Sequence, residues 1–119
     1  MFSLGQILIS AAVGVAASAL VLLVYRKVAK LEASVDNASW PLPLVVGLSI
    51  LVWRAAGNTP VLNEDPIAFV SPNDVLCPVI TYVSLGIYAG FRGVSGGADW
   101  RPIRALLTIV SLVVNIVTI

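Results

Sequence analysis

The sequence of 119 residues contains no histidine and only one cysteine, Cys77. Without imidazole, the chain cannot ligate haem through histidine or build a catalytic triad or general base on it. A single thiol cannot form an internal disulfide or a cysteine zinc site. Because no histidine is present to activate its thiol, Cys77 is interpreted as a small buried hydrophobe. We therefore expect no catalytic residues, no metal site and no enzymatic activity.

Charge is the second deficit of this sequence. Only 11% of the residues are charged and 59% are apolar, and the mean hydropathy is +1.00. A soluble domain would carry about 25% charged residues. The net charge of +1 provides no clustered basic surface for nucleic acid, so no nucleic-acid partner is expected. The composition predicts an all-α integral membrane protein with a single domain.

Four stretches of the chain carry no charge at all: Met1–Tyr25, Asn37–Trp53, Val75–Phe91 and Ala105–Ile119. An apolar helix needs about 20 residues to cross the hydrocarbon layer of a bilayer. The first stretch reaches this length, and the others reach it only with flanking arginines at helix ends. We predict about four transmembrane helices in two helical hairpins. Their expected bounds are about 3–30, 41–56, 75–91 and 102–119, with an acidic, proline-rich loop over 57–74.

Basic residues are distributed unevenly between the two sides of this expected bundle. The loops after the first and third helices share a side and hold most of them: Arg26, Lys27, Lys30, Arg92, Arg101 and Arg104. Basic residues favour the cytoplasmic side of a membrane. Both termini are therefore predicted to be non-cytoplasmic. A second segment that enters and leaves on the same side would reverse this orientation.

The first apolar stretch contains Ala17-Ser18-Ala19, which has the small-x-small form of a signal cleavage site. No basic residue precedes this stretch, whereas a signal peptide usually begins with one. We therefore expect the stretch to be retained as a helix.

Arg54 is the one charged residue that can fall within an expected span. One interpretation makes it a contact for an anion or a lipid headgroup, or an ion-pair partner of Glu64 or Asp65. The other, which we favour, is an arginine beside Trp53 whose side chain extends to the membrane interface. No carboxylate is expected at the centre of a span, which argues against a proton- or cation-coupled transporter.

Small and polar residues recur at helical spacing in three of the expected spans. They are predicted to serve helix packing: Ser10, Gly14 and Ser18 in the first helix, Gly86 and Gly90 in the third, and Asn115 in the last. Asn115 shares its face with Thr108, Ser111 and Thr118. This polar stripe has an alternative interpretation as the lining of a pore in an oligomer. We favour packing, because hydroxyls and one amide provide few groups for a conduction path.

The connection between the last two helices is basic and rich in glycine. Arg92, Arg101 and Arg104 are candidates for contact with phospholipid headgroups or with a charged lumen. The alternative is that they only determine topology. Bound phospholipid is accordingly the only cofactor considered. The expected partners are membrane lipid and either further copies of the chain or a larger membrane assembly.

The segment 74–119 resembles the helical hairpin of conjugative, type IV secretion-type pilins. The resemblance rests on Cys77-Pro78-Val79 at the start of an apolar helix and on a turn that contains Gly96, Gly97, Trp100 and Arg101. It implies a hairpin that is stored in a membrane and assembled with phospholipid into a filament. It also implies that Arg92, Arg101 and Arg104 face the lumen of that filament. Residues 1–73 have no counterpart in this resemblance.

These observations predict a non-enzymatic structural membrane protein that assembles through helix packing. A pilin-like subunit of a lipid-containing filament is the form that the resemblance implies. One alternative is an accessory subunit of a larger membrane complex or a membrane protein of a virion. Another is a small homo-oligomeric channel or transporter. The expected location is the cell membrane or a lipid-containing surface filament.

Overall fold

The computed structural model describes residues 3–30, 33–58, 71–94 and 100–118. Every element within these ranges is an α-helix: α1 (Leu4–Val28), α2 (Ala33–Ser39), α3 (Leu42–Ala56), α5 (Pro72–Arg92) and α6 (Trp100–Thr118). The predicted all-α class is therefore confirmed for the described part of the chain. Four helical stretches are long and apolar enough to cross a membrane, and α2 with α3 forms one of them, Val35–Ala56.

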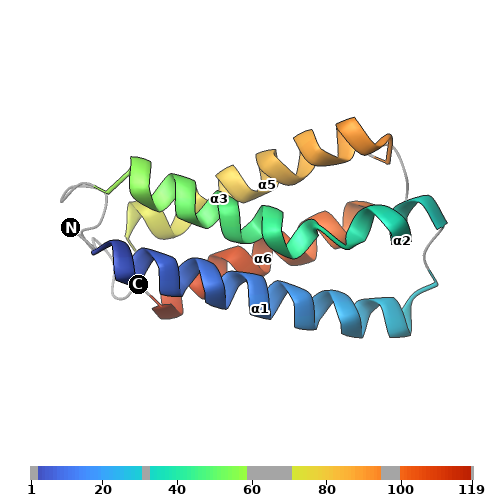
Figure 1. The fold of residues 1–119 in the computed structure, drawn as a ribbon, viewed down its shortest axis with the longest axis horizontal. Helices are drawn as coiled ribbons and strands as arrows, with labels where there is room; N and C mark the ends of the chain where they lie inside the picture. Colours follow the sequence, from blue (N-terminus) through green and yellow to red (C-terminus); the bar gives the residue numbers. More distant parts are fainter. Residues whose placement is uncertain (1–2, 31–32, 59–70, 95–99, 119) are drawn as a thin grey trace.

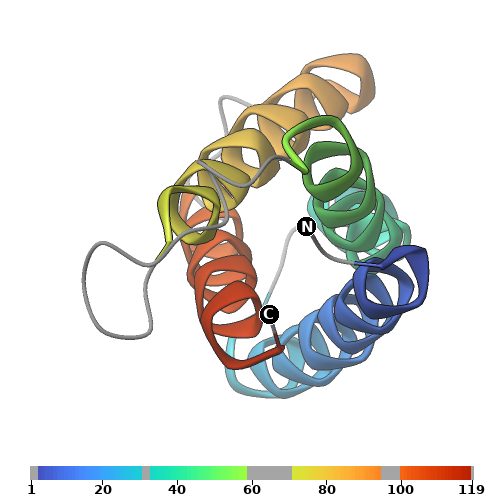
Figure 2. The ribbon, with the colours of Figure 1, turned by 90° about the vertical axis from the view of Figure 1, so that its left-hand side faces the viewer.

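The long helices form an antiparallel bundle (Figure 1). α1 packs beside α3 and α6, and α5 packs beside the same two helices. Each of the four helices therefore lies at a corner of the bundle and packs mainly against two others (Figure 2). The start of α1 and the end of α6 lie at one end, together with the end of α3 and the start of α5 (Figure 1). We call this the terminal end. The opposite end, where α1 ends and α6 begins, is the loop end.

Two helices begin with the same hydrogen-bonded cap. At α1, the Ser3 hydroxyl accepts from the Gln6 N–H at 3.2 Å, and the Gln6 side chain accepts from the Ser3 N–H at 2.8 Å. At α5, Ser71 and Asp74 repeat this exchange. Such reciprocal bonds satisfy N–H groups that have no partner within the helix. As a result, α5 begins at Pro72, inside the segment that the sequence analysis assigned to a loop over 57–74.

The second span is longer than its charge-free stretch. α2 precedes α3, and only Trp40 and Pro41 separate them. This span was expected to begin near residue 41, after the charge-free stretch opens at Asn37. In the structure the Asp36 carboxylate lies 2.7 Å from Arg26 Nη2 of α1, and the Arg26 guanidinium lies 4.3 Å from the centre of the Trp40 ring. This ion pair accommodates a charge within a helix that reaches spanning length.

Glycine allows α1 and α3 to approach closely. A Cβ atom on Gly14 would lie 2.6 Å from Ile50 Cδ1, and one on Gly47 would lie 2.3 Å from Val15 Cγ2. No larger side chain fits at either position without movement of these neighbours. The close contact fixes the first hairpin, against which α5 and α6 then pack.

Candidate functional site

A continuous set of polar side chains occupies the core of the bundle at the terminal end. Two come from each of three helices: Ser49 and Arg54 from α3, Asp74 and Thr81 from α5, and Ser111 and Asn115 from α6. All six are buried, with at most 4% of any residue exposed. We call this set the polar row. It is the strongest candidate for a functional site, because buried polar groups are costly unless each finds a partner.

An ion pair forms the outer part of the polar row. Arg54 Nη2 donates to Asp74 Oδ1, and Arg54 Nε donates to Asn115 Oδ1 at 2.8 Å. The other carboxylate oxygen of Asp74 accepts the backbone N–H of Ser71 at 2.9 Å. Hydrogen bonds of this kind offset the cost of removing two charges from water. One carboxylate thus caps α5 and neutralises an arginine of α3 at the same time.

Hydroxyl groups continue the polar row toward the middle of the bundle. The Asn115 amide donates to the Ser111 carbonyl at 2.7 Å. The Ser111 hydroxyl lies 2.7 Å from that of Thr81, which lies 2.8 Å from that of Ser49. Hydrogen bonds between side chains thus connect α3, α5 and α6. The row ends at Ser49, whose hydroxyl donates to the carbonyl of Val46 in its own helix.

A second polar contact closes the terminal end outside the row. Trp53 Nε1 donates to Asn73 Oδ1 at 3.1 Å, and Asn73 Nδ2 donates to the Gly57 carbonyl at 2.7 Å. These bonds connect the last turn of α3 to the first turn of α5. They hold Arg54 and Asp74 in register.

The favoured interpretation of Arg54 is wrong. Its side chain does not extend to the membrane interface but points into the bundle, where 1% of the residue is exposed. Glu64 and Asp65, the partners considered in the sequence analysis, lie outside the described residues. The observed partner is Asp74. This partner was not predicted because the loop was expected to extend to residue 74, although the capping pattern Ser71-x-x-Asp74 indicates an earlier helix start.

Four of the predicted packing residues are buried: Ser10, Gly14 and Ser18 on α1 and Asn115 on α6. The Ser10 hydroxyl of α1 lies 2.7 Å from the Thr118 hydroxyl of α6. Gly14 faces Ile50 of α3, and Ser18 is buried without a hydrogen-bond partner among the described residues. Asn115 belongs to the polar row. Its stripe therefore faces the inside of a single bundle.

The two glycines predicted to pack on α5 have different surroundings. A Cβ atom on Gly86 would lie 2.2 Å from Arg104 Nη2, so this glycine receives an arginine of α6. Gly90 is exposed, and its Cβ position has no atom of the described chain within 4 Å. The expectation that Gly90 packs against a helix is thus not met within the described residues. A glycine pair in the sequence cannot distinguish these two environments.

The predicted basic residues lie at or near the loop end. Arg92 and Arg101 are exposed, and Arg92 Nη1 donates to the Tyr88 hydroxyl at 3.2 Å. That hydroxyl donates in turn to the Ala38 carbonyl at 2.6 Å, which connects α5 to α2. Arg104 is half-buried and lies against α5 rather than at the end of the bundle. No acidic group of the described residues pairs with any of the three.

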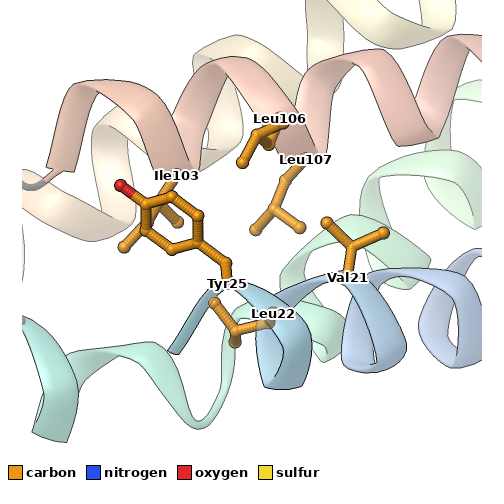
Figure 3. Close-up of a pocket in the computed structure, with 6 residues that line it drawn as sticks. All are labelled: Val21, Leu22, Tyr25, Ile103, Leu106 and Leu107. Carbon is orange, nitrogen blue, oxygen red and sulfur yellow. The ribbon is translucent and has the colours of Figure 1, made fainter. Parts of the chain in front are cut away.

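An apolar seam between α1 and α6 is one of the features that resemble a pocket. Val21, Leu22 and Tyr25 face Ile103, Leu106 and Leu107 across it (Figure 3). The space between them does not admit a water molecule. Toward Val28 the seam opens into a groove of about 410 Å³ with an entirely apolar lining. Such a groove suits hydrocarbon rather than a polar substrate.

The chain finds no match among protein-family models, curated proteins or solved structures. Its function must therefore be inferred from its own geometry. The described residues include no group of histidine, cysteine, aspartate or glutamate placed to hold a metal ion. Cys77 is fully buried, as predicted. The polar row is arranged to hold helices together, because each of its members bonds to another helix or to its own backbone.

Proposed function

We propose that this chain is a non-enzymatic membrane protein that inserts as a four-helix bundle and serves as an accessory subunit of a larger membrane assembly. One observation carries the proposal: the members of the polar row bond to one another inside the bundle, whereas the outer surface exposes many large apolar side chains. A protein built in this way has its own fold inside the membrane. Its outer faces remain available to lipid and to other membrane helices.

The distribution of apolar side chains supports membrane insertion. Large hydrophobic residues are exposed along all four long helices, for example Leu20, Leu48, Ile87 and Ile109, each of them more than half exposed. Soluble monomers rarely expose contiguous apolar surface of this extent. The molecule is 44 Å long, which matches a bilayer of roughly 40–45 Å with its headgroups. Lipid is therefore the natural solvent for this surface.

The basic residues support one orientation of the bundle. Arg26, Lys27, Arg92 and Arg101 lie at the loop end, and this end is proposed to face the cytoplasm. Both termini then face away from it. Cysteines placed at Ser3 and at Lys27 in a Cys77→Ala background test this orientation. An impermeant thiol reagent outside the cell should label the first and not the second, and the reverse pattern would contradict it.

A channel within one bundle is not the function that we propose. The polar row runs from Asp74 to Ser49 and ends near the middle of the bundle. Beyond it, the described core contains Leu22, Leu85 and Leu107. A conduction path needs polar groups or water along its whole length. The polar row extends only about half the length of the bundle, which suits a role in holding the helices together better than a role in conduction.

A pilin-like filament subunit remains a second candidate. The observation that favours it is the exposure of Arg92 and Arg101 at the turn of the α5–α6 hairpin, where the resemblance implies a basic lumen. However, Arg54 of α3 bonds to both helices of this hairpin. A filament would therefore have to take up all four helices together. Recovery of the chain from sheared extracellular fibres would support this candidate, and its restriction to membranes would contradict it.

Native purification tests the principal proposal. A tagged copy is extracted in mild detergent, and the proteins that accompany it are quantified by mass spectrometry. An accessory subunit should bring down a fixed stoichiometric set of other membrane proteins. An unrelated four-span protein with the same tag, expressed at the same level, is the control. Recovery of the chain alone, or only with copies of itself, would contradict the proposal.

A further inference from the structure

Arg104 is a charged residue on the outer surface of the bundle, between α5 and α6. Its Nε and Nη2 atoms both donate to the carbonyl oxygen of Tyr82, at 3.0 and 2.7 Å. Its guanidinium also lies 3.5 Å from the centre of the Tyr82 ring. The side chain therefore has a defined position on α5 even though it is not enclosed by the core.

Along the long axis of the bundle, the guanidinium extends away from the loop end, toward the midpoint of α5. Tyr82 lies about 15 Å along α5 from Arg92, at a rise of 1.5 Å per residue. Arginines near the end of a membrane helix usually extend outward to the headgroups. Arg104 instead extends inward, to a depth that lipid phosphates do not normally reach.

Gly86 makes this inward position possible. A Cβ atom at this residue would lie 2.2 Å from Arg104 Nη2 and 2.7 Å from Arg104 Cζ. The guanidinium thus lies directly against the backbone of α5, in space that any other residue would fill. Its position is set in advance by the fold, which lowers the entropic cost of binding a further group.

The groups that hold Arg104 do not neutralise it. The carbonyl and the phenol ring of Tyr82 are both uncharged, and the ion pairs of the described residues are those of Arg26 and Arg54. An uncompensated charge within a membrane span is costly and usually marks a functional contact. By comparison, Arg54, which is buried in α3, pairs with the carboxylate of Asp74. Arg104 therefore has no counter-charge among the described residues, and an acidic group from elsewhere would supply one.

The surface around Arg104 is suited to a helix. Val79 and Val83 are about half exposed, as is Tyr82. Gly90 follows Gly86 by one turn and has no described atom within 4 Å of its Cβ position. A smooth apolar surface beside a glycine allows another helix backbone to approach closely. A second copy of this chain does not supply the acid from its described residues, because Asp36 and Asp74 are both paired.

We propose that the outer face of α5 and α6 around Arg104 binds a transmembrane helix of another protein, and that an aspartate or glutamate of this helix pairs with the guanidinium. This inference rests on the proposed function as an accessory subunit and names the contact through which the subunit docks. Two parallel N–H···O bonds are the geometry that arginine favours with a carboxylate. The carboxylate would replace the Tyr82 carbonyl as the hydrogen-bond acceptor of the guanidinium, or it would accept from the guanidinium beside that carbonyl.

A model peptide tests the proposal with the full chain. The purified protein is placed in phosphatidylcholine vesicles at pH 8 with a synthetic Leu-Ala helix that carries one central glutamate, and association is measured by energy transfer between two dyes. The comparison peptide has glutamine at the same position. We expect the glutamate peptide to bind about tenfold more tightly than the glutamine peptide. Arg104→Gln should abolish this preference, and helix content by circular dichroism verifies that the variant is folded.

Two glycine variants on the same helix provide a matched pair. Gly86→Ala displaces the guanidinium and should abolish the preference for glutamate. Gly90→Ala leaves Arg104 in place and should retain that preference, even if both peptides bind more weakly. Equal binding of the two peptides to the unmodified protein would overturn the proposal. So would a preference that persists in Arg104→Gln.

Other occupants of this face give different results in the same assay. If phosphatidylglycerol at a few mole per cent displaces the glutamate peptide, the ligand is a lipid phosphate and the proposal is wrong. If two labelled copies of the protein associate through Arg104 without peptide, the partner is a second copy and the proposal is also wrong. In native purification, a partner set unchanged by Arg104→Gln overturns this contact alone. A chain recovered without partners overturns the proposed function itself.

Discussion

The two halves of the bundle core differ in chemistry although the same helices build both. At the terminal end, three helices are joined by the polar row around Arg54, Asp74 and Asn115. At the loop end, the buried side chains include Leu22, Leu85 and Leu107. In a membrane, apolar contacts give little preference for one helix arrangement, because lipid tails are equally apolar. The terminal half therefore specifies which helices pair, and the loop half fills the space between them.

The largest effect is expected from the ion pair of the terminal half. Asp74→Ala removes the carboxylate and leaves the Arg54 guanidinium buried without its counter-charge. Loss of one member of a buried pair costs about 3–5 kcal/mol. We expect the free energy of unfolding to fall by this amount. It is measured by circular dichroism as the protein is titrated from mild detergent into sodium dodecyl sulfate.

The double variant Arg54→Met/Asp74→Leu is the control for this prediction. It replaces both charges with apolar groups, and such replacements of buried pairs are often neutral or stabilising. We expect most of the lost stability to return. If the double variant is as unstable as Asp74→Ala, the residues act through shape and packing, and the contrast between the two halves is not one of charge.

An apolar truncation in the loop half should have an intermediate effect. Leu107 is fully buried on α6, and Leu107→Ala leaves a cavity among its neighbours. Core truncations of this kind cost about 2–5 kcal/mol in soluble proteins, and we expect about 2 kcal/mol here because lipid competes for the same apolar groups. The same titration measures it. A loss larger than that of Asp74→Ala would reverse the comparison between the halves.

Removal of one hydroxyl from the polar row should have a smaller effect. Thr81 lies between Ser49 and Ser111, and Thr81→Val preserves its shape while removing both contacts. Hydrogen bonds between membrane helices contribute about 0.6 kcal/mol on average, so a loss of about 1 kcal/mol is expected. Thr108→Val is the matched control, because the Thr108 hydroxyl donates only to the Arg104 carbonyl of its own helix. Equal losses for the two variants would show that the row does not join the helices.

The smallest effect is expected at Gly90, outside both halves of the core. Its Cβ position is unobstructed among the described residues, and alanine favours a helix over glycine by about 0.5–1 kcal/mol. Gly90→Ala should therefore raise the free energy of unfolding of the isolated protein slightly. Gly14→Ala, whose Cβ would lie 2.6 Å from Ile50, should lower it in the same titration. A loss of stability at Gly90 would reveal a contact on the outer face of α5 within the chain itself.

Much of the fold can be predicted from the sequence because charge is so sparse. The absence of charge over Met1–Tyr25 identifies α1 nearly to its ends, and the small residues of that helix indicate its packed face. The polar face of the last helix is visible as well, since Ser111 and Asn115 recur at helical spacing. These patterns are local, and reading them does not require knowledge of contacts with distant parts of the chain.

The contacts between distant residues could not be predicted in the same way. Asp36 and Asp74 both lie beside charge-free stretches, and both were expected to lie outside the helices, which were predicted to begin near residues 41 and 75. In the structure each is inside a helix, because an arginine on a neighbouring helix compensates its charge. A hydropathy pattern places the end of a membrane-spanning helix at every charged residue. Only the three-dimensional pairing shows which charged residues lie within helices.

The Arg54–Asp74 contact also sets an order for biosynthesis. Asp74 follows Arg54 by 20 residues, and Asn115 follows it by 61. When α3 first emerges from the ribosome, neither partner has emerged, so the arginine enters the translocon or the edge of the bilayer without its counter-charge. The first turn of α5 then supplies the carboxylate of Asp74, and α6 supplies the amide of Asn115. Membrane integration of the first hairpin is thus completed by the second, and a released chain truncated before residue 74 should hold α3 less deeply than the full chain does.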